Sequence, residues 1–599
     1  MKSQIRIGNA GGFWGDDLNA FRRQLMGGQL DYISIDFLAE ITMSILRKQQ
    51  LKNPQMGYVT DFVQMIGENA EELYRKGVKV LTNAGGINPL ECGRQVARLL
   101  KEKNIPLKIA VVTGDNILAE IPHLRKEGIS FHNMENGKPF EEVEGRIQSA
   151  NTYIGMWPLV RALETGADIV IAGRVTDTSI TMAPMAYEFG WQPGDFDKIA
   201  SALVAGHIIE CGAQVTGGNY SDWRKVTSWD NMAYPIIEVQ PDSTFVVTRH
   251  PGTGGLVNAD TVREQLVYEM GNPAAYISPD VIADFRSIRL KEEDPDRVKV
   301  SGIKGYAPTP FLKVSMAYQE GYVSAGSIII SAPDALMKAR TFASIFWNRL
   351  GLKFQKAHTA YQGYNSCHLN LAGEIEPNEI LLTFSIYDED LKKHEVFAKS
   401  VAPLILSGPP GVAVTGGRPH IKTVLSYWPA LIPKEKISAH IHLLNENGDP
   451  EAEDSFPSLT GQEAEFEEST DETVQIATEG SPGSFKGEKK VKLYELCLAR
   501  SGDKGDTANI GLLARSQEIY TWMKQHISAS FVKYLFREAC HGKVVRYELD
   551  NLWGLNFLLE ESLDGGGTRS LMADPQGKTF AQALLNVEVT IPEDLLKKP

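Results

Sequence analysis

The first 225 residues alternate short apolar runs with longer amphipathic stretches, and this alternation limits the folds that the chain can adopt. The apolar runs cover residues 5–8, 32–38, 78–81, 107–112 and 168–172, and the amphipathic stretches cover residues 62–75, 89–103, 153–164 and 180–189. Strands that alternate with helices at this spacing form βαβ units around a mostly parallel sheet. Two runs, VKVLTNAG and ADIVIAGR, are nearly all apolar, as strands covered on both faces are. We therefore expect an α/β domain over residues 1–225, with helices flanking the sheet.

The sequence after residue 225 follows different patterns. At 599 residues the chain is too long for one hydrophobic core. Residues 226–444 contain longer strand-like runs, with helical patterns at 334–350 and 391–402, which predict an α+β subdomain of the same large body. Residues 445–490 are acidic and poor in large apolar side chains, and we expect a flexible linker there, with an acidic docking element as the alternative. Residues 491–599 predict a separate small α/β domain of ferredoxin-like type.

Composition excludes several classes of protein. The net charge is −14, and residues 451–480 contribute ten acidic and no basic residues, so −4 remains for the rest. Without a basic field, nucleic acid is not an expected partner. The five cysteines form no CxxC, and neither a signal sequence nor an apolar run of membrane-spanning length is visible. We expect a cytoplasmic protein that makes no membrane contact.

Common catalytic and cofactor motifs are missing from the chain. There is no GxxxxGK[ST], GxSxG or HExxH, and the first glycine loop does not have the GxGxxG spacing. His440 and His442 would share one strand face, but nothing nearby completes a set of metal ligands. No bound cofactor and no metal are predicted.

Polar, glycine-rich loops follow each of the five apolar runs of the α/β domain. Successive parallel strands end at the same edge of an open sheet, which is where such sheets bind ligands, so the loops are expected to converge. Their candidate site residues are Asn9, Gly11, Gly12, Asp16, Asp17, Asp36, Asn83, Gly85, Gly86, Asn88, Asp115, Arg174, Asp177 and Thr178.

The residue types in these loops indicate a kind of chemistry. Asp16, Asp36, Asp115 and Asp177 supply carboxylates for general base catalysis. The asparagines and Thr178 supply hydrogen bonds, and Arg174 suits a carboxylate ligand. Bare Gly-Gly backbone can stabilise an oxyanion. Such a set fits proton abstraction next to a carbonyl, hydration or C–C cleavage. Each residue also has a structural interpretation as a turn former or helix cap.

The tetrapeptide Asn-Ala-Gly-Gly occurs twice, at residues 9–12 and 83–86, each time after an apolar run. A dinucleotide loop is disfavoured, because the glycine spacing is wrong and Asp16 and Asp17 would face the phosphates. We interpret the two copies as two walls of one site, each presenting an asparagine and a Gly-Gly backbone to a carbonyl-bearing ligand.

The C-terminal region carries the charged string ARSGDKGDTAN at residues 499–509. It could form an anion-binding nest with Lys504 as a point charge, a cation site with Asp503 and Asp506, or only a tight turn between two strands. Asp503 and Lys504 are therefore candidate binding residues.

Several long motifs resemble one known family. GNAGGFWGDD, DYISIDFLAE, VLTNAGGINP, IAGRVTDTS, ARSGDKGDTANIG and DPQGK, spread over nearly the whole chain, are similar to the acyclic terpene utilisation (AtuA-type) proteins. The resemblance implies a role in the breakdown of citronellol- and geraniol-type compounds, which are degraded as CoA thioesters through a biotin-dependent carboxylation.

Together these observations predict a catabolic enzyme acting on a branched or carboxylated acyl-CoA, or a related carboxylic acid, by hydratase or lyase chemistry. CoA would enter as part of the substrate, and we expect a homo-oligomer. Two alternatives stay open: a non-catalytic accessory or assembly subunit of an acyl-CoA carboxylase, and a metal-assisted hydrolase that uses the aspartates.

Overall fold

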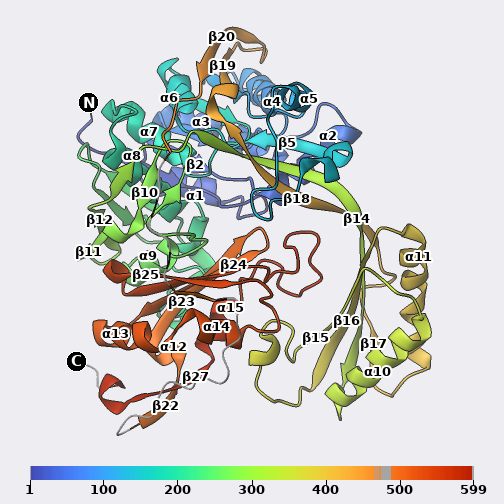
Figure 1. Cartoon of the computed structure of the whole chain (residues 1–599). Coiled ribbons are helices and arrows are strands. Elements are labelled where there is room, and N and C mark those ends of the chain that lie inside the picture. Colours follow the sequence, from blue (N-terminus) through green and yellow to red (C-terminus); the bar gives the residue numbers. More distant parts are fainter. Residues whose placement is uncertain (1, 464–465, 467–468, 470, 474–487, 597–599) are drawn as a thin grey trace. The chain divides into compact units, whose positions relative to one another are not determined.

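The chain folds into two compact units. The computed structural model describes residues 2–463, 466, 469, 471–473 and 488–596 (Figure 1). Unit 1 comprises Met1–Leu266, Asn272–Ala317 and Trp428–Glu468, and unit 2 comprises Val267–Gly271, Tyr318–Tyr427 and Ser469–Pro599. Among the described residues, no helix is both long and apolar enough to cross a bilayer.

Unit 1 is built on a sheet of eleven strands in the order β11-β12-β8-β7-β1-β2-β3-β6-β4-β19-β20. The five strands β1, β2, β3, β6 and β4 are parallel to one another, as the alternation in residues 1–225 predicts. Antiparallel strands extend the sheet on both sides. The strands are β1 (Ile5–Asn9), β2 (Tyr32–Ile35), β3 (Lys79–Thr82), β4 (Ile109–Thr113), β6 (Ile169–Ala172), β7 (Ile236–Val239), β8 (Phe245–Thr248), β11 (Arg289–Asp294), β12 (Arg297–Ser301), β19 (Ser438–Leu444) and β20 (Pro450–Pro457).

Helices cover both faces of the parallel strands, and strand β2 shows how. Ile33 and Ile35 point into a core shared with α1, α3 and α4. Ser34, on the opposite face, accepts a hydrogen bond from Thr181 of α7 at 3.1 Å. Alternate residues of a strand face opposite sides, so a strand covered on both faces must be apolar throughout or internally satisfied. The helices of unit 1 are α1 (Ala20–Gly27), α2 (Glu40–Lys52), α3 (Thr60–Lys76), α4 (Pro89–Glu102), α5 (Ile121–Lys126), α6 (Trp157–Glu164), α7 (Ser179–Phe189), α8 (Phe196–Ile209) and α9 (Ala259–Leu266).

Local sequence signals set several helix ends. Helix α4 begins with Pro89 at a position where a missing N–H leaves no unpaired donor. Helix α3 ends at Gly77, whose φ of 65° lies in the left-handed region and whose N–H bonds back to Leu73. Unit 1 also contains β5 (Ile147–Thr152) and the small sheet of β9 (Tyr276–Ile277), β10 (Ile282–Asp284) and β13 (Lys304–Tyr306).

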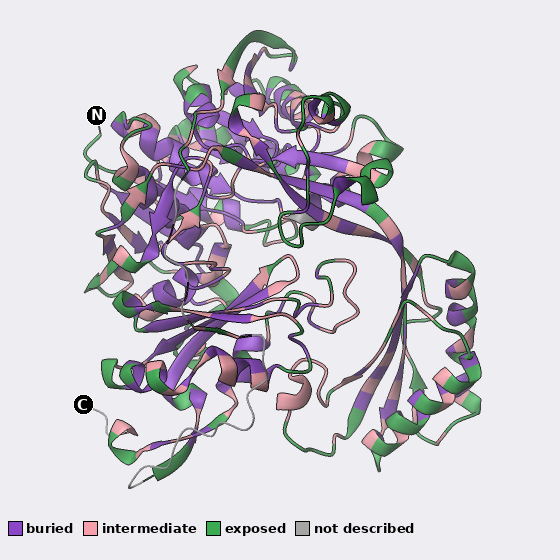
Figure 2. Ribbon diagram, in the orientation of Figure 1, coloured by how far each residue is buried: buried purple, intermediate pink, exposed green. Residues whose placement is uncertain are grey.

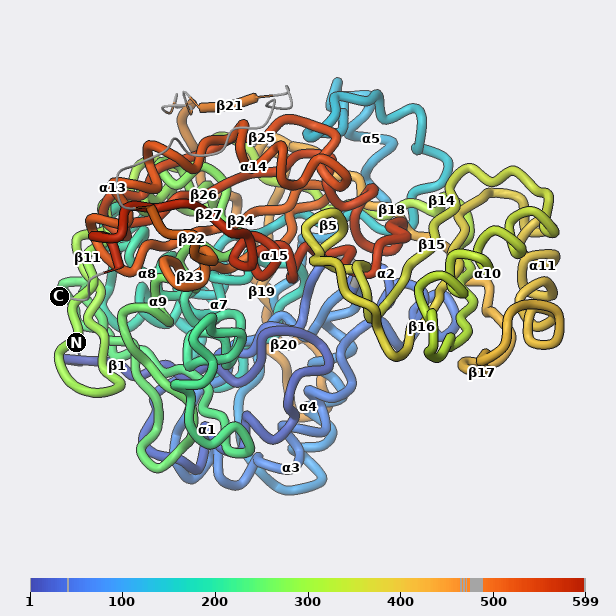
Figure 3. Tube along the Cα trace, turned by 90° about the horizontal axis from the view of Figure 1, so that it is seen from below, coloured from blue at the N-terminus to red at the C-terminus, as the bar shows by residue number. Residues whose placement is uncertain are grey.

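Unit 2 contains a lobe in which two helices pack on one antiparallel sheet. The sheet has the order β15-β16-β14-β17, and α10 and α11 lie together beside it in both views (Figures 1 and 3). Phe346 of α10 stacks on Phe384 of β16 with ring centroids 4.0 Å apart. The outward faces of both helices are exposed or half-buried (Figure 2). The elements are α10 (Ala335–Leu350), β15 (Lys356–Gln362), β16 (Glu379–Asp388), α11 (Leu391–Ser400) and β17 (Val412–Val414), together with parts of β14 (Phe311–Ser331) and β18 (Ile421–Pro433), whose other parts belong to unit 1.

The C-terminal part of unit 2 is the predicted ferredoxin-like domain. Its antiparallel sheet has the order β21-β25-β26-β24-β23, and its core includes residues of α13, α14 and α15. Ser516 and Ser528 cap α13 and α14 through their hydroxyl groups. The elements are β21 (Asp471–Thr473), β22 (Glu488–Lys492), α12 (Leu493–Leu496), β23 (Cys497–Lys504), β24 (Thr507–Ala514), α13 (Gln517–His526), α14 (Ala529–Leu535), β25 (Val544–Leu549), β26 (Gly554–Leu559), α15 (Phe580–Leu585) and β27 (Glu588–Pro592).

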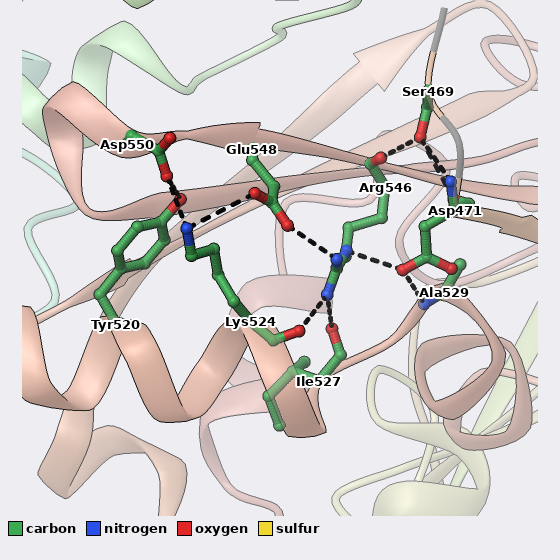
Figure 4. A network of polar contacts seen from close by, with 9 residues as sticks. All are labelled: Ser469, Asp471, Tyr520, Lys524, Ile527, Ala529, Arg546, Glu548 and Asp550. Atoms are coloured by element: carbon green, nitrogen blue, oxygen red, sulfur yellow. Dashed lines mark hydrogen bonds and ion pairs between the residues drawn. The ribbon is translucent and has the colours of Figure 1, made fainter.

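A polar network centred on Arg546 ties β25 of this domain to α13 (Figure 4). The guanidinium donates to the main-chain carbonyls of Lys524 and Ile527 at 2.9 and 3.1 Å, where α13 ends. It also pairs with Asp471 at 2.7 Å and Glu548 at 2.9 Å. A cation at the C-terminal end of a helix satisfies carbonyl groups that have no partner within the helix.

The start of the C-terminal domain combines several short elements. Residues 488–504 are divided into β22, α12 and β23, because β22 pairs with β27 whereas β23 pairs with β24. The charged string contains a tight turn between two strands, one of its three expected forms: Arg500–Lys504 continue β23, and Gly505 and Asp506 separate β23 from β24. No sequence pattern indicates strand β5.

The predicted linker, residues 445–490, is described only in part. Residues 450–457 form β20 at the edge of the main sheet, and residues 471–473 form β21. Residues 464–465, 467–468, 470 and 474–487 lie outside the described residues. The segment boundaries predicted at 225, 444 and 490 stay predictions, and the two compact units divide the chain differently.

Candidate active site

Four of the predicted site residues come together where the parallel strands end. Asp36 follows β2, Asn83 follows β3, and Arg174 and Asp177 follow β6. Because β2, β3 and β6 are adjacent and parallel, the three loops leave the same edge of the sheet. The registers of the strands, and not any single motif, bring these side chains within hydrogen-bonding distance.

Asn83 fixes the carboxyl group of Asp36. Its Nδ2 donates to Oδ1 of Asp36 at 2.5 Å, and its Oδ1 accepts the N–H of Phe37 at 2.9 Å. The N–H of Leu38 also donates to Oδ1 of Asp36, at 3.1 Å. Both hydrogen bonds to this carboxyl group therefore use the same oxygen, and Asp36 itself is only 5% exposed.

Arg174 lies buried next to this pair. It is 2% exposed, and its guanidinium donates to the carbonyl of Leu38 at 2.9 Å and lies 3.0 Å from the carboxylate of Asp177. It also stacks over the ring of Tyr153, 4.2 Å from the centroid. A buried cation held by a carboxylate, a carbonyl and an aromatic face has a fixed position, which favours a role in orienting its neighbours.

Two carboxyl groups of the site occupy different environments. Burial, followed by the charge of Asp177, raises the pKa of Asp36 well above its ordinary value, although Arg174 and the hydrogen bond from Asn83 oppose the shift. The side chain of Asp177 is 34% exposed and is paired with Arg174. A pair of nearby carboxyl groups with unlike environments is the arrangement that separates a general acid from a general base.

Asp115 fixes the backbone next to the site through hydrogen bonds. Its Oδ2 accepts the N–H of Arg174 at 2.9 Å and the Nδ2 of Asn151 at 2.7 Å. A Cβ on Gly173 would lie 2.4 Å from its Oδ1, so only glycine fits there. Burial raises the pKa of Asp115 to about 6, against the hydrogen bonds that it accepts. Asp115 thus holds the backbone that carries Arg174.

The two Asn-Ala-Gly-Gly copies form hydrogen-bonded turns. The N–H groups of Gly11 and Gly12 donate to Asn9 and Asp16, both at 3.0 Å. Those of Gly85 and Gly86 donate to the carbonyls of Ala172 and Asn83 at 3.1 and 3.2 Å. All four N–H groups are therefore occupied within the protein, and their predicted use for an oxyanion stays a prediction.

The remaining loop residues also have internal contacts. Asp16 accepts the hydroxyl of Tyr234 at 2.5 Å, and Asp17 pairs with Arg23 at 2.6 Å. Asn88 donates to the carbonyls of Pro54 and Met56. Thr178 is the N-cap residue of α7 and is 1% exposed, and within the described part of the chain its hydroxyl has no hydrogen-bond partner.

Asp503 and Lys504 belong to unit 2, where their strand helps to hold the segment 267–271. Asp503 accepts from Lys578 at 3.2 Å, and Lys578 also donates to Glu269 at 2.9 Å. Asn509 donates to the carbonyl of Val267 and accepts the N–H of Glu269, at 2.9 and 2.8 Å. The motifs ARSGDKGDTANIG and DPQGK therefore both contribute residues that contact the segment 267–271.

Two further residues, which no sequence motif indicates, lie near Arg174. Tyr153 stacks on its guanidinium, and Lys313 of β14 lies 5.3 Å from the centroid of the same ring. The carbonyl of Lys313 accepts the N–H of Tyr153 at 2.9 Å. The pairing of β5 with β14 makes this contact, and no local pattern predicts it. In the described part of the chain, no group of three or more His, Cys, Asp or Glu could hold a metal ion.

The fold and site define an α/β protein with a carboxylate–amide–arginine cluster at the edge of a parallel sheet, followed by a ferredoxin-like domain. Residues 5–443 match the acyclic terpene utilisation family protein AtuA, and residues 491–590 match the AtuA ferredoxin-like domain. The chain belongs to the AtuA family, and membership implies involvement in acyclic terpene utilisation. Comparison with curated proteins and with solved structures finds no match.

Proposed function

We propose that this protein is an enzyme that adds water to, or removes it from, a branched or carboxylated acyl-CoA or related carboxylic acid in acyclic terpene catabolism. The observation that carries the proposal is the pair Asp36 and Asp177, two neighbouring carboxyl groups in unlike environments with Arg174 beside them. CoA would take part only as a portion of the substrate.

Each carboxyl group would have its own role. Asp177, which is partly exposed and paired with Arg174, would remove a proton from water as the oxygen bonds to the β-carbon of an unsaturated thioester. The electron pair of the double bond moves to the α-carbon, which takes a proton from Asp36. Hydrogen bonds occupy Oδ1 of Asp36, so its proton would reside on Oδ2. Proton exchange with solvent then restores both groups.

Turnover of a panel of branched unsaturated acyl-CoA compounds tests the proposal, because hydration removes the ultraviolet absorbance of the conjugated thioester. Asp36→Asn and Asp177→Asn should each lower kcat by about 100-fold or more, as loss of a general acid or base does. Asp168→Asn is the matched control, since Asp168 lies at the opposite edge of the same sheet and binds the N–H of Lys108. Full activity in both site variants, or no activity of the wild type on any member of the panel, would refute it.

A non-catalytic role as an accessory subunit of a biotin-dependent acyl-CoA carboxylase is the second candidate. It is favoured by one observation, that the four Gly-Gly N–H groups of the loops are already hydrogen-bonded within the protein. Affinity purification of the full chain from its native host decides between the two. Stoichiometric biotinylated subunits would support this role, and a homo-oligomer free of them would count against it.

A further inference from the structure

Unit 1 contains a cavity whose lining includes no residue of the carboxylate cluster Asp36, Asn83, Arg174 and Asp177. Its volume is about 310 Å³, and its lining is mostly apolar, with Trp157, Phe196, Pro308 and Leu459 among the side chains. The one ionisable residue in the lining is Asp280. A cavity of this size exceeds the space of about ten water molecules, at roughly 30 Å³ each, and so accommodates a small organic ligand.

Asp280 presents one carboxyl oxygen that the protein does not use. Its Oδ2 accepts the N–H of Met156 at 2.9 Å, just before α6 begins. Within the described residues, Oδ1 accepts no hydrogen bond, although Asp280 is only 6% exposed. Because Asp280 lines the cavity, a ligand that donates a hydrogen bond could pair with this oxygen.

Lys434 balances the charge of Asp280. It is 2% exposed, and its ammonium donates to the carbonyl of Pro279 at 2.6 Å. Burial lowers the pKa of Lys434 to about 8, against the charge of Asp280. Burial also raises the pKa of Asp280 to about 6, against the hydrogen bond from Met156 and the charge of Lys434. Near pH 7 both Asp280 and Lys434 are therefore charged, and their net charge is zero.

The segment that follows β20 forms one wall of the cavity. The N–H of Gln462 donates to the carbonyl of Pro308 at 2.8 Å. A Cβ on Gly461 would lie 2.0 Å from the carbonyl oxygen of Thr309, so glycine is required for this close approach. Residues 459–462 belong to the stretch that the sequence predicts as a linker, and here they are packed against the folded body of unit 1.

We propose that this cavity is a binding site for a neutral compound with a hydrocarbon body and a hydroxyl group that donates to Oδ1 of Asp280. The apolar lining takes the hydrocarbon body. Because the charge of Lys434 already balances that of Asp280, an ammonium ligand would add a net positive charge to the site. A carboxylate would place a negative charge against Asp280. A hydroxyl supplies the missing donor and changes no charge. Binding here requires no turnover at Asp36, so it stands or falls separately from the proposed function.

Isothermal titration calorimetry of the full chain near pH 7 with octanol, octanoate and octylamine tests the site, since the three probes share one hydrocarbon chain and differ in the head group. Octanol should bind at least tenfold more tightly than either charged probe. Gly194→Leu should weaken octanol binding at least fivefold, because Gly194 lines the cavity and an added Cβ meets nothing within 4 Å. Asp280→Asn should also weaken it, because the amide then faces the hydroxyl with a different hydrogen-bonding pattern.

Gly145→Leu is the matched control, since Gly145 also has open space around its Cβ and does not line the cavity. Octanol binding to that variant should equal binding to the wild type. The proposal is overturned if octanol does not bind the wild type, if octylamine or octanoate binds as tightly, or if Gly194→Leu and Gly145→Leu bind octanol equally well.

Discussion

Replacing Asp115 by asparagine should change the stability of the protein relative to the wild type in a pH-dependent way. The variant should compare more favourably with the wild type at neutral pH than in acid. The side chain is 3% exposed, and its Oδ2 accepts two hydrogen bonds that an asparagine oxygen can also accept. The substitution keeps the shape of the side chain and removes its ability to carry a charge. Any pH-dependent difference between variant and wild type therefore reports the ionisation of this one group.

The magnitude and sign follow from the raised pKa. Burial on folding raises the pKa of Asp115 from its ordinary value of 3.8 to about 6. The folded protein therefore holds the proton more tightly, and its stability falls as pH rises through this interval. At 1.36 kcal/mol for each pKa unit the full effect is about 3 kcal/mol. The asparagine variant lacks this loss, so its stability relative to the wild type should improve by about 2–3 kcal/mol between pH 4 and pH 7.5.

Urea denaturation at the two pH values measures the difference, and hydrogen exchange identifies the transition in which β4 and the Arg174 loop unfold. Thr152→Val is the control, because Thr152 is equally buried and donates to the carbonyl of Asp115 but cannot ionise. Its effect should be about 1 kcal/mol and the same at both pH values. An Asp115→Asn effect that is also independent of pH, or that changes in the opposite direction, would refute the reasoning.

Two further outcomes concern unit 2. Gly511→Ala should destabilise it by about 1–3 kcal/mol, since the new Cβ would lie 2.2 Å from Val267, whereas Gly373→Ala has open space and should change the melting temperature little. Arg546→Lys should lower stability by about 1–2 kcal/mol in thermal denaturation, because an ammonium has three donors on one atom, whereas the guanidinium reaches two helix-end carbonyls and two carboxylates. Lys543→Ala, which removes only exposed ion pairs, should cost less than about 1 kcal/mol; equal losses would contradict the account of Arg546.

The parallel sheet was predictable because its signal is local. The nearly continuous apolar runs before Asn83 and Arg174 became β3 and β6, whose residues are buried on both faces apart from the partly exposed Lys79. Chain order then places the ends of β1, β2, β3, β4 and β6 at one edge of the sheet. The expected ferredoxin-like C-terminal domain is confirmed as well.

The partners of the loop residues were not predictable. Nothing in the tetrapeptide Asn-Ala-Gly-Gly distinguishes Asn9, which bonds to its own loop, from Asn83, which reaches the carboxyl group of Asp36. The difference depends on which strand lies next to each loop. Similarly, no sequence pattern shows that the glycines at 502 and 511 make room for residues 267–269 against a strand.

By itself, the sequence determined the alternation of strands and helices, the edge at which the polar loops gather, and the types of side chain placed there. These properties follow from the period of the apolar residues along the chain. Only the tertiary structure decided which carboxyl groups are neighbours, how deeply each is buried, and that residues 459–462 close a cavity beside Asp280. The pKa of a carboxyl group and the partners of a hydrogen bond depend on atoms far away in sequence, and folding alone brings those atoms into contact.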